Sequence, residues 1–194
     1  MKLKAVIALA LAATAAPTFA AGESFSSKLK WGFDVGTHVY DMAGTESFNP
    51  SLELGLHAML PLANLQGGDI TLEAGLSQTV IYGTSKLKTR MDYLGYSLET
   101  VQADYRRVFM ALGFETQGRW YLKPQIGFEH ITAKIRLYDP DASTGFTERD
   151  GDSNGFAAIG IGHRFADGKK GVLTFASLGD ADDQDYRITY SASF

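Results

Sequence analysis

Residues able to do chemistry are sparse in this chain, which has no cysteine and four histidines. A hydroxyl nucleophile needs a base within hydrogen-bond reach and a third group that orients the base. The nearest approach along the sequence is His130-Ile131-Thr132, which contains no serine and has no acid in frame. We therefore predict no catalytic residues, no cofactor and no enzyme activity.

One acidic run resembles a metal loop. Residues 150–155 read D-G-D-S-N-G, and alternating oxygens of this kind surround Ca²⁺ in EF-hand loops, where the glycine permits a sharp turn. The glutamate expected at the twelfth position is Ile161, so the EF-hand interpretation fails. Asp150, Asp152 and Asn154 are left as candidates for a looser calcium site.

The elements that would position these residues begin after Ala20. Residues 1–20 have a basic start, a short apolar run and small residues at the end, which predict a cleaved signal peptide rather than a membrane helix. Residues 21–194 then form one domain of 174 residues. Removing two lysines and no acids changes the formal charge from −4 to −6, which indicates no affinity for nucleic acid.

Apolar and polar residues alternate along most of this domain. Trp31, Phe33 and Val35 share one face of a run whose other face carries Gly32 and Asp34. A period of two predicts β-strands, and we expect eight of them, near 29–39, 52–62, 70–77, 101–115, 119–133, 154–165, 170–178 and 185–194. In the fourth strand a β-bulge at Arg106-Arg107 would bring Tyr105 onto the face of Val108.

The expected connections alternate between short and long. Short ones fall at 63–68, 115–118 and 166–169, whereas longer ones fall at 41–50, 83–100 and 136–153, with a compact one at 179–184. This alternation is typical of membrane barrels with short periplasmic turns and long outer loops. The predicted fold is an all-β, eight-stranded antiparallel up-and-down transmembrane β-barrel.

Three features favour apolar side chains outside and charges inside. The polar face is rich in glycine and charge, which suits the narrow interior of eight strands. Aromatic residues near the periplasmic strand ends predict an interfacial girdle, made of Trp31, Phe114, Trp120 and Phe165. The last strand carries an apolar stripe that ends on the final residue, made of Tyr186, Ile188, Tyr190 and Phe194.

With this terminal stripe, the chain resembles the small bacterial outer-membrane barrels of the OmpA transmembrane-domain, OmpX and Opa-like class. The resemblance rests on architecture and on the last strand, which in that class is an assembly signal. It implies insertion into the outer membrane of a Gram-negative bacterium by the barrel assembly machinery, and contact with membrane lipid and lipopolysaccharide.

The predicted lumen holds five bases and four acids, a near balance that suggests a cross-linked and plugged interior. These residues are Lys30, Asp34, Glu53, Glu73, Arg107, Lys123, Glu129, Arg164 and Arg187. The first functional hypothesis is a structural or surface-interaction protein, with the loop at 136–153 as the contact for an extracellular ligand. The alternatives are a narrow porin-like channel for small solutes and an enzyme that modifies lipid A.

Overall fold

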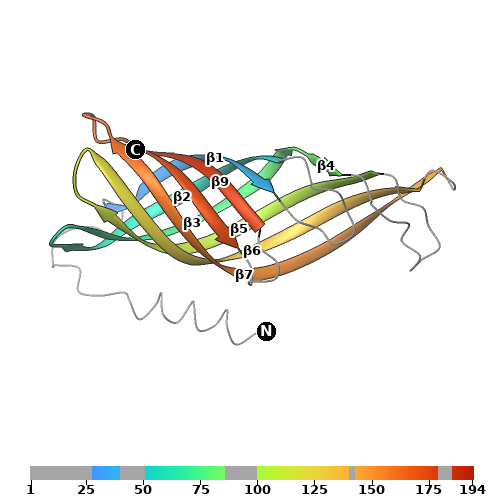
Figure 1. Ribbon diagram of the computed structural model, residues 1–194, viewed down its shortest axis with the longest axis horizontal. Helices are drawn as coiled ribbons and strands as arrows, with labels where there is room; N and C mark the ends of the chain where they lie inside the picture. Colours follow the sequence, from blue (N-terminus) through green and yellow to red (C-terminus); the bar gives the residue numbers. More distant parts are fainter. Residues whose placement is uncertain (1–27, 40–50, 86–99, 140–142, 179–184) are drawn as a thin grey trace.

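The computed structural model describes residues 28–39, 51–85, 100–139, 143–178 and 185–194. The described residues form one antiparallel sheet of strands (Figure 1). Its strands are β1 (Lys30–Val39), β2 (Ser51–Leu65), β3 (Gly68–Ile81), β4 (Gly83–Ser85), β5 (Thr100–Thr116), β6 (Trp120–Asp139), β7 (Thr144–Arg164), β8 (Lys170–Leu178) and β9 (Asp185–Ser193). No described helix is long and apolar enough to cross a membrane.

The sheet closes on itself. Apart from β3 and β4, strands that follow one another in sequence pair with each other. Strand β1 also pairs with β9, from Gly32 opposite Ser193 to Val39 opposite Tyr186. The short strand β4 continues β3, because both pair with β5. The predicted closed eight-stranded antiparallel barrel is therefore confirmed. Near the short turns, closure gives every described strand a paired neighbour on both sides.

The alternation in sequence becomes an alternation between outside and lumen. On β1, Phe33 is 55% exposed and its neighbour Asp34 is 4% exposed. On β8, Leu173 and Phe175 are exposed while Val172 and Ala176 are buried. Successive side chains of a strand point to opposite faces, so one face of every strand lines the lumen.

Three short turns lie at one end of the barrel, on the left of Figure 1. Each contains a glycine with positive φ, namely Gly67 (108°), Gly118 (110°) and Gly168 (85°). L-residues with a side chain rarely adopt this conformation, so glycine permits these tight reversals. The turns fall within the connections predicted as short, although β5 continues through Glu115 and Thr116.

Two expectations about β5 to β7 are wrong. The register of β5 with β6 is continuous from Thr100 to Gly113, so no bulge occurs at Arg106. Tyr105 consequently lies in the lumen with Arg107, and Arg106 points outward. The predicted outer loop at 136–153 is mostly strand, because β6 extends to Asp139 and β7 begins at Thr144. The backbone N–H and C=O groups of these residues pair across the hairpin. The segment is therefore strand although its side chains are polar.

The longer hairpin changes the shape of the barrel. The last pair between β7 and β8 is Phe156 with Leu178, so the first twelve residues of β7 extend beyond β8. Figure 1 shows β5, β6 and β7 projecting past the other strands, with Thr100 of β5 paired to Tyr138 of β6. The other predicted long connections, and the signal peptide at 1–20, lie wholly or largely outside the described residues.

Candidate functional site

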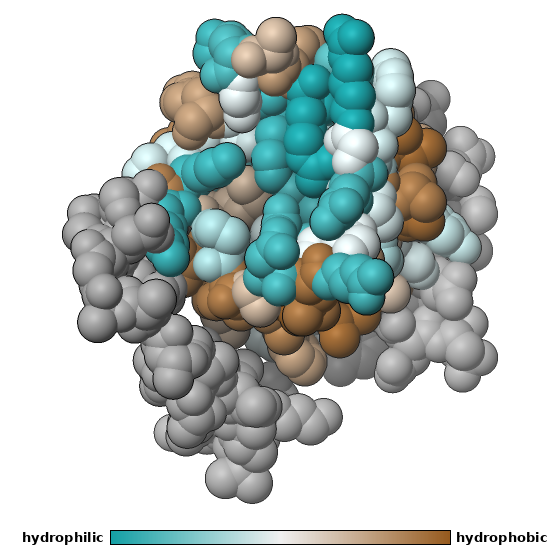
Figure 2. Space-filling view, turned by 90° about the vertical axis from the view of Figure 1, so that its left-hand side faces the viewer, coloured by the Kyte–Doolittle hydropathy of each residue, from teal (hydrophilic) through white to brown (hydrophobic). Residues whose placement is uncertain are grey.

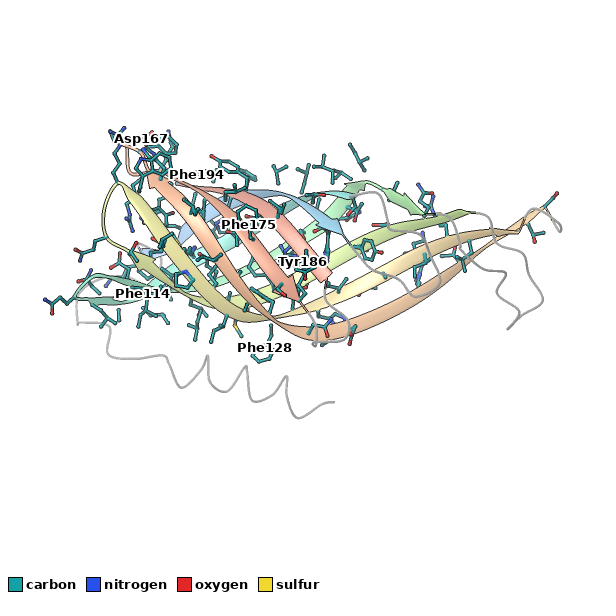
Figure 3. The ribbon with its side chains drawn as sticks, viewed as in Figure 1. Phe114, Phe128, Asp167, Phe175, Tyr186 and Phe194 are labelled. Carbon is teal, nitrogen blue, oxygen red and sulfur yellow. The ribbon has the colours of Figure 1, made fainter. Side chains whose placement is uncertain are left out.

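The outer wall of the barrel is apolar. Exposed aliphatic and aromatic side chains occur on every long strand, among them Val35, Leu56, Leu76, Val108, Leu112, Ile126, Phe128, Ile159, Leu173, Phe175 and Ile188. Phe128 points away from the ribbon in Figure 3. A soluble protein rarely exposes a contiguous apolar surface of this extent, whereas a bilayer requires one.

The predicted girdle lies on the wall at the short-turn end. Trp31, Trp120 and Phe165 are exposed there, and Phe114 is half-buried. Trp120 and Phe165 both contact His163, with ring centroids 4.7 and 4.8 Å from it, and Arg119 Nε donates to His163 Nε2 at 3.0 Å. Figure 2 views this end and shows hydrophilic residues across it with hydrophobic ones towards its sides.

The predicted terminal stripe also faces outward. Tyr186, Ile188, Tyr190 and Phe194 are all exposed on the wall formed by β9 and the residue that follows it. Phe194 packs near Phe33 with ring centroids 5.7 Å apart, and its backbone N–H donates to the Trp31 carbonyl at 3.0 Å. The last residue thus adds contacts between β9 and β1, the two strands whose pairing closes the barrel.

The lumen contains most of the predicted charged set. Seven of its nine members are at least nine-tenths buried, namely Asp34, Glu53, Glu73, Arg107, Lys123, Glu129 and Arg187. Arg164 and Lys30 are half-buried at the short-turn end, and Lys30 joins none of the ion pairs found among the described residues. Three residues outside the predicted set, His38, His57 and Glu115, are buried with them.

Glu115 is the centre of an ionic cluster near the short turns. It forms ion pairs with Lys170, with Lys123 at 3.4 Å and with Arg164 at 3.4 Å. Lys123 also pairs with Glu73, which accepts a hydrogen bond from Gln125 at 2.8 Å. Glu115 is fully buried, so these three cations supply the charge that compensates its carboxylate.

A second cluster lies further along the lumen. Arg187 Nη1 donates to Glu129 Oε2 at 2.6 Å, and Arg107 Nη1 approaches the same oxygen at 3.5 Å. Arg107 Nε also donates to Ser77 Oγ at 3.0 Å, and Ser77 in turn donates to Glu53 at 3.2 Å. The chain of contacts therefore crosses the lumen from β6 to β2.

Two buried histidines also line the lumen. His57 Nδ1 donates to Asp34 Oδ1 at 2.9 Å, and Ser191 donates to the same oxygen at 2.6 Å. His38 Nδ1 lies 3.7 Å from Glu53 Oε1. Both histidines lie on the lumen face of their strands, and the register across strands determines which carboxylate each one contacts.

Between these clusters is a cavity of about 50 Å³. It is bordered by ionic side chains such as Asp34, Lys123 and Arg187, and by small or apolar ones such as Ala158 and Val172. This volume holds a few water molecules at most, since each needs roughly 10–15 Å³ on this measure. Around this cavity the lumen is crossed by ion pairs and has room for few water molecules.

The outer hairpin holds the remaining candidates. His130 Nδ1 lies 2.9 Å from Ser153 Oγ, on the strand opposite, so the serine missing from the local sequence is supplied by β7. Among the described residues, no carboxylate hydrogen-bonds to His130 to orient it. Such a pair lacks the third group that activates a nucleophile.

The candidate calcium residues lie in strand β7 rather than in a turn. Asp152 is exposed and accepts the backbone N–H of Ser153 at 2.7 Å, while Asn154 is half-buried. The side chain of Asp150 lies outside the described set. Within the described residues, no group of three acidic, histidine or cysteine side chains is placed to hold a metal ion.

Comparison with known proteins relates this geometry to solved barrels. No family model matches the chain, and no curated protein matches its sequence. Among solved structures, Ail, the attachment invasion locus protein of Yersinia pestis, aligns with a TM-score of 0.56 at 11% identity, over 85% of this chain and 95% of Ail. The chain has the fold of the small outer-membrane barrels.

A second barrel of this fold supports the same conclusion. Neisserial surface protein A aligns with a TM-score of 0.51 at 5% identity, over 86% of this chain and 96% of that protein. The alignments cover nearly all of both barrels, so the small-barrel architecture is shared from end to end. At such low identity the likeness concerns the fold alone.

Proposed function

We propose that this chain is an outer-membrane barrel of a Gram-negative bacterium that acts as a structural and surface-interaction protein, with β6 and β7 as its projecting contact element. The observation that carries the proposal is the combination of an apolar outer wall with an ionic, closely filled lumen. The fold that it shares with Ail supports the same role, since that protein is named for attachment. The short turns then face the periplasm and the hairpin faces outward.

Shortening the hairpin tests the surface role. Replacing residues 138–146 by a two-residue turn retains the barrel wall and removes the end of β6 and the start of β7. We expect bacteria that display the shortened protein to lose adherence to host cells or matrix proteins, down to the level of cells without the barrel. Gln66→Ser in the opposite turn is the control. Unchanged adherence after shortening would contradict the surface role.

Conductance separates this proposal from the channel alternative. The ion pairs of Glu115 and Glu129 cross the lumen, and the cavity between them is small. We therefore expect the protein, reconstituted into planar bilayers, to show no steady large conductance. A larger porin run in the same bilayers is the positive control. Stable open levels in most recordings would favour a channel for small solutes.

A further inference from the structure

The outer wall changes from apolar to basic along β5, β6 and β7. Above the apolar wall lie Arg106 on β5, Lys134 and Arg136 on β6, and Arg149 on β7, which we call the outer basic patch. The three arginines are exposed and Lys134 is half-buried. At the outer end of the barrel, the exterior faces of the other strands carry no base among the described residues.

The register brings these four cations close together. Lys134 lies directly opposite Arg149, and Arg106 lies opposite Thr132, which is two residues before Lys134 on the same face. Directly opposed side chains have Cβ atoms about 5 Å apart, and diagonal neighbours about 7–8 Å. Arg136 follows Lys134 by two residues on the same face of β6, so the four bases are neighbours on one side of the wall.

Charge within the patch is poorly compensated. Among the described residues of this face, Asp104 is the one carboxylate, and it lies opposite Lys134. The patch therefore has four positive charges and one negative charge. No ion pair within 4 Å joins any of the four bases to a described carboxylate. Arg136 instead stacks near Tyr82, with its guanidinium 5.8 Å from the ring centre. Like charges directly opposed across strands are destabilising, so Lys134 and Arg149 favour an external anion between them.

The height of the patch identifies the anion. Arg106 is two residues beyond the exposed Val108, and Lys134 is six residues beyond the exposed Phe128. With a rise of about 3.3 Å per residue and strands tilted by about 40°, these bases lie roughly 5–15 Å beyond the last exposed apolar residues of their own strands. Phosphates of lipid headgroups occupy this level, whereas a soluble glycan would be met first by the hairpin tip.

We propose that the outer basic patch is a binding site for the phosphate groups of lipopolysaccharide in the surrounding outer leaflet. This inference rests on the outward orientation of the hairpin in the proposed function. Arginine forms bidentate contacts with phosphate oxygens, and lysine contributes a point charge. Bound lipopolysaccharide would fix the β5–β7 wall against the membrane surface at the base of the projecting hairpin.

Titration of lipid A tests the site. The chain has no cysteine, so Gln66→Cys in a periplasmic turn provides a single dye position for measuring affinity in detergent micelles. Lys134→Gln with Arg149→Gln should weaken binding of bisphosphorylated lipid A about tenfold or more, since two charge-assisted contacts are lost. Lys134→Arg with Arg149→Lys keeps both charges and should bind within a few-fold of the unmodified protein.

The matched control is Arg119→Gln with Lys169→Gln, which removes two exposed bases at the opposite end and should leave affinity unchanged. Dephosphorylated lipid A should bind the unmodified protein as weakly as the patch variant binds the bisphosphorylated form. Normal affinity of the patch variant would overturn the proposal. Equal competition by phosphatidylglycerol, or stronger competition by a heparin fragment, would overturn it in favour of a general anion site or a glycan site.

A separate measurement distinguishes failure of this site from failure of the proposed function. Every variant is first run on gels with and without boiling, because a folded membrane barrel changes mobility on heating. A heat-dependent shift with no difference in lipid A affinity rejects the patch alone. Absence of the shift in the unmodified protein, together with a soluble monomer, rejects the membrane barrel itself.

Discussion

Glu115→Leu is expected to destabilise the folded barrel by about 3–5 kcal/mol, the cost of breaking a buried ionic cluster by removing one partner. The substitution leaves Lys170 and Arg164 near the short turns without the carboxylate that both of them contact. Lys123 keeps Glu73 as its partner, so the loss is concentrated on the other two cations. Urea unfolding of the protein in lipid vesicles, followed by fluorescence of Trp31 and Trp120, measures the effect.

Two further variants identify the cause. Adding Lys170→Leu to Glu115→Leu removes an uncompensated charge and should recover part of the lost stability. Asp167→Asn disrupts an exposed pair with Lys169, whose hydrogen bond lowers the pKa of the Asp167 carboxyl, and should not move the unfolding midpoint. If Glu115→Leu unfolds at the same urea concentration as the unmodified protein, the ionic cluster does not stabilise the lumen.

Ile126→Arg is expected to cost about 2–4 kcal/mol, the penalty for a charge on the lipid-facing wall near the middle of a bilayer. Ile126 is 66% exposed on β6, between Leu122 and Phe128 on the same face. If this wall faced water, an arginine here would change stability by only about 0.5 kcal/mol. The size of the effect in vesicle unfolding therefore reports which medium surrounds the barrel.

The control places the same side chain outside the apolar wall. Gln66→Arg adds an arginine to the exposed β2–β3 turn, and it should leave the unfolding free energy unchanged. A result in which Ile126→Arg is as stable as Gln66→Arg would reject the lipid-facing orientation. The same result would also reject the proposed membrane location, but it would not contradict the closed-barrel fold.

The predictions from sequence were most successful where a residue's environment depends on its own strand. Alternation with a period of two assigns Phe33 and Asp34 to opposite faces, whatever strand lies beside them. The predicted burial of Arg107, Glu129 and Arg187 followed from the same rule. Alternation does not show where a strand ends. The polar residues at 136–153 therefore predict a loop, where the structure has the paired ends of β6 and β7.

The same limit explains the misplaced Tyr105. An outward tyrosine would have continued the apolar stripe of β5, which suggested a bulge at Arg106. In the structure, Tyr105 lies in the lumen and its backbone N–H bonds to Thr79 Oγ1 at 3.0 Å. A tyrosine has an apolar ring and a polar hydroxyl, so its residue type alone does not decide between the polar lumen and the apolar wall.

The amino-acid sequence by itself determined the strands, their two faces and the apolar stripe that ends on Phe194, because these depend on local periodicity. Only the tertiary structure decided which charges meet. Glu115 stood in an expected turn, yet the closed register places it among Lys123, Arg164 and Lys170, which lie 8 to 55 residues further along the chain. The opposition of Lys134 and Arg149 arises in the same way, because the register of a strand pair is a property of two segments together.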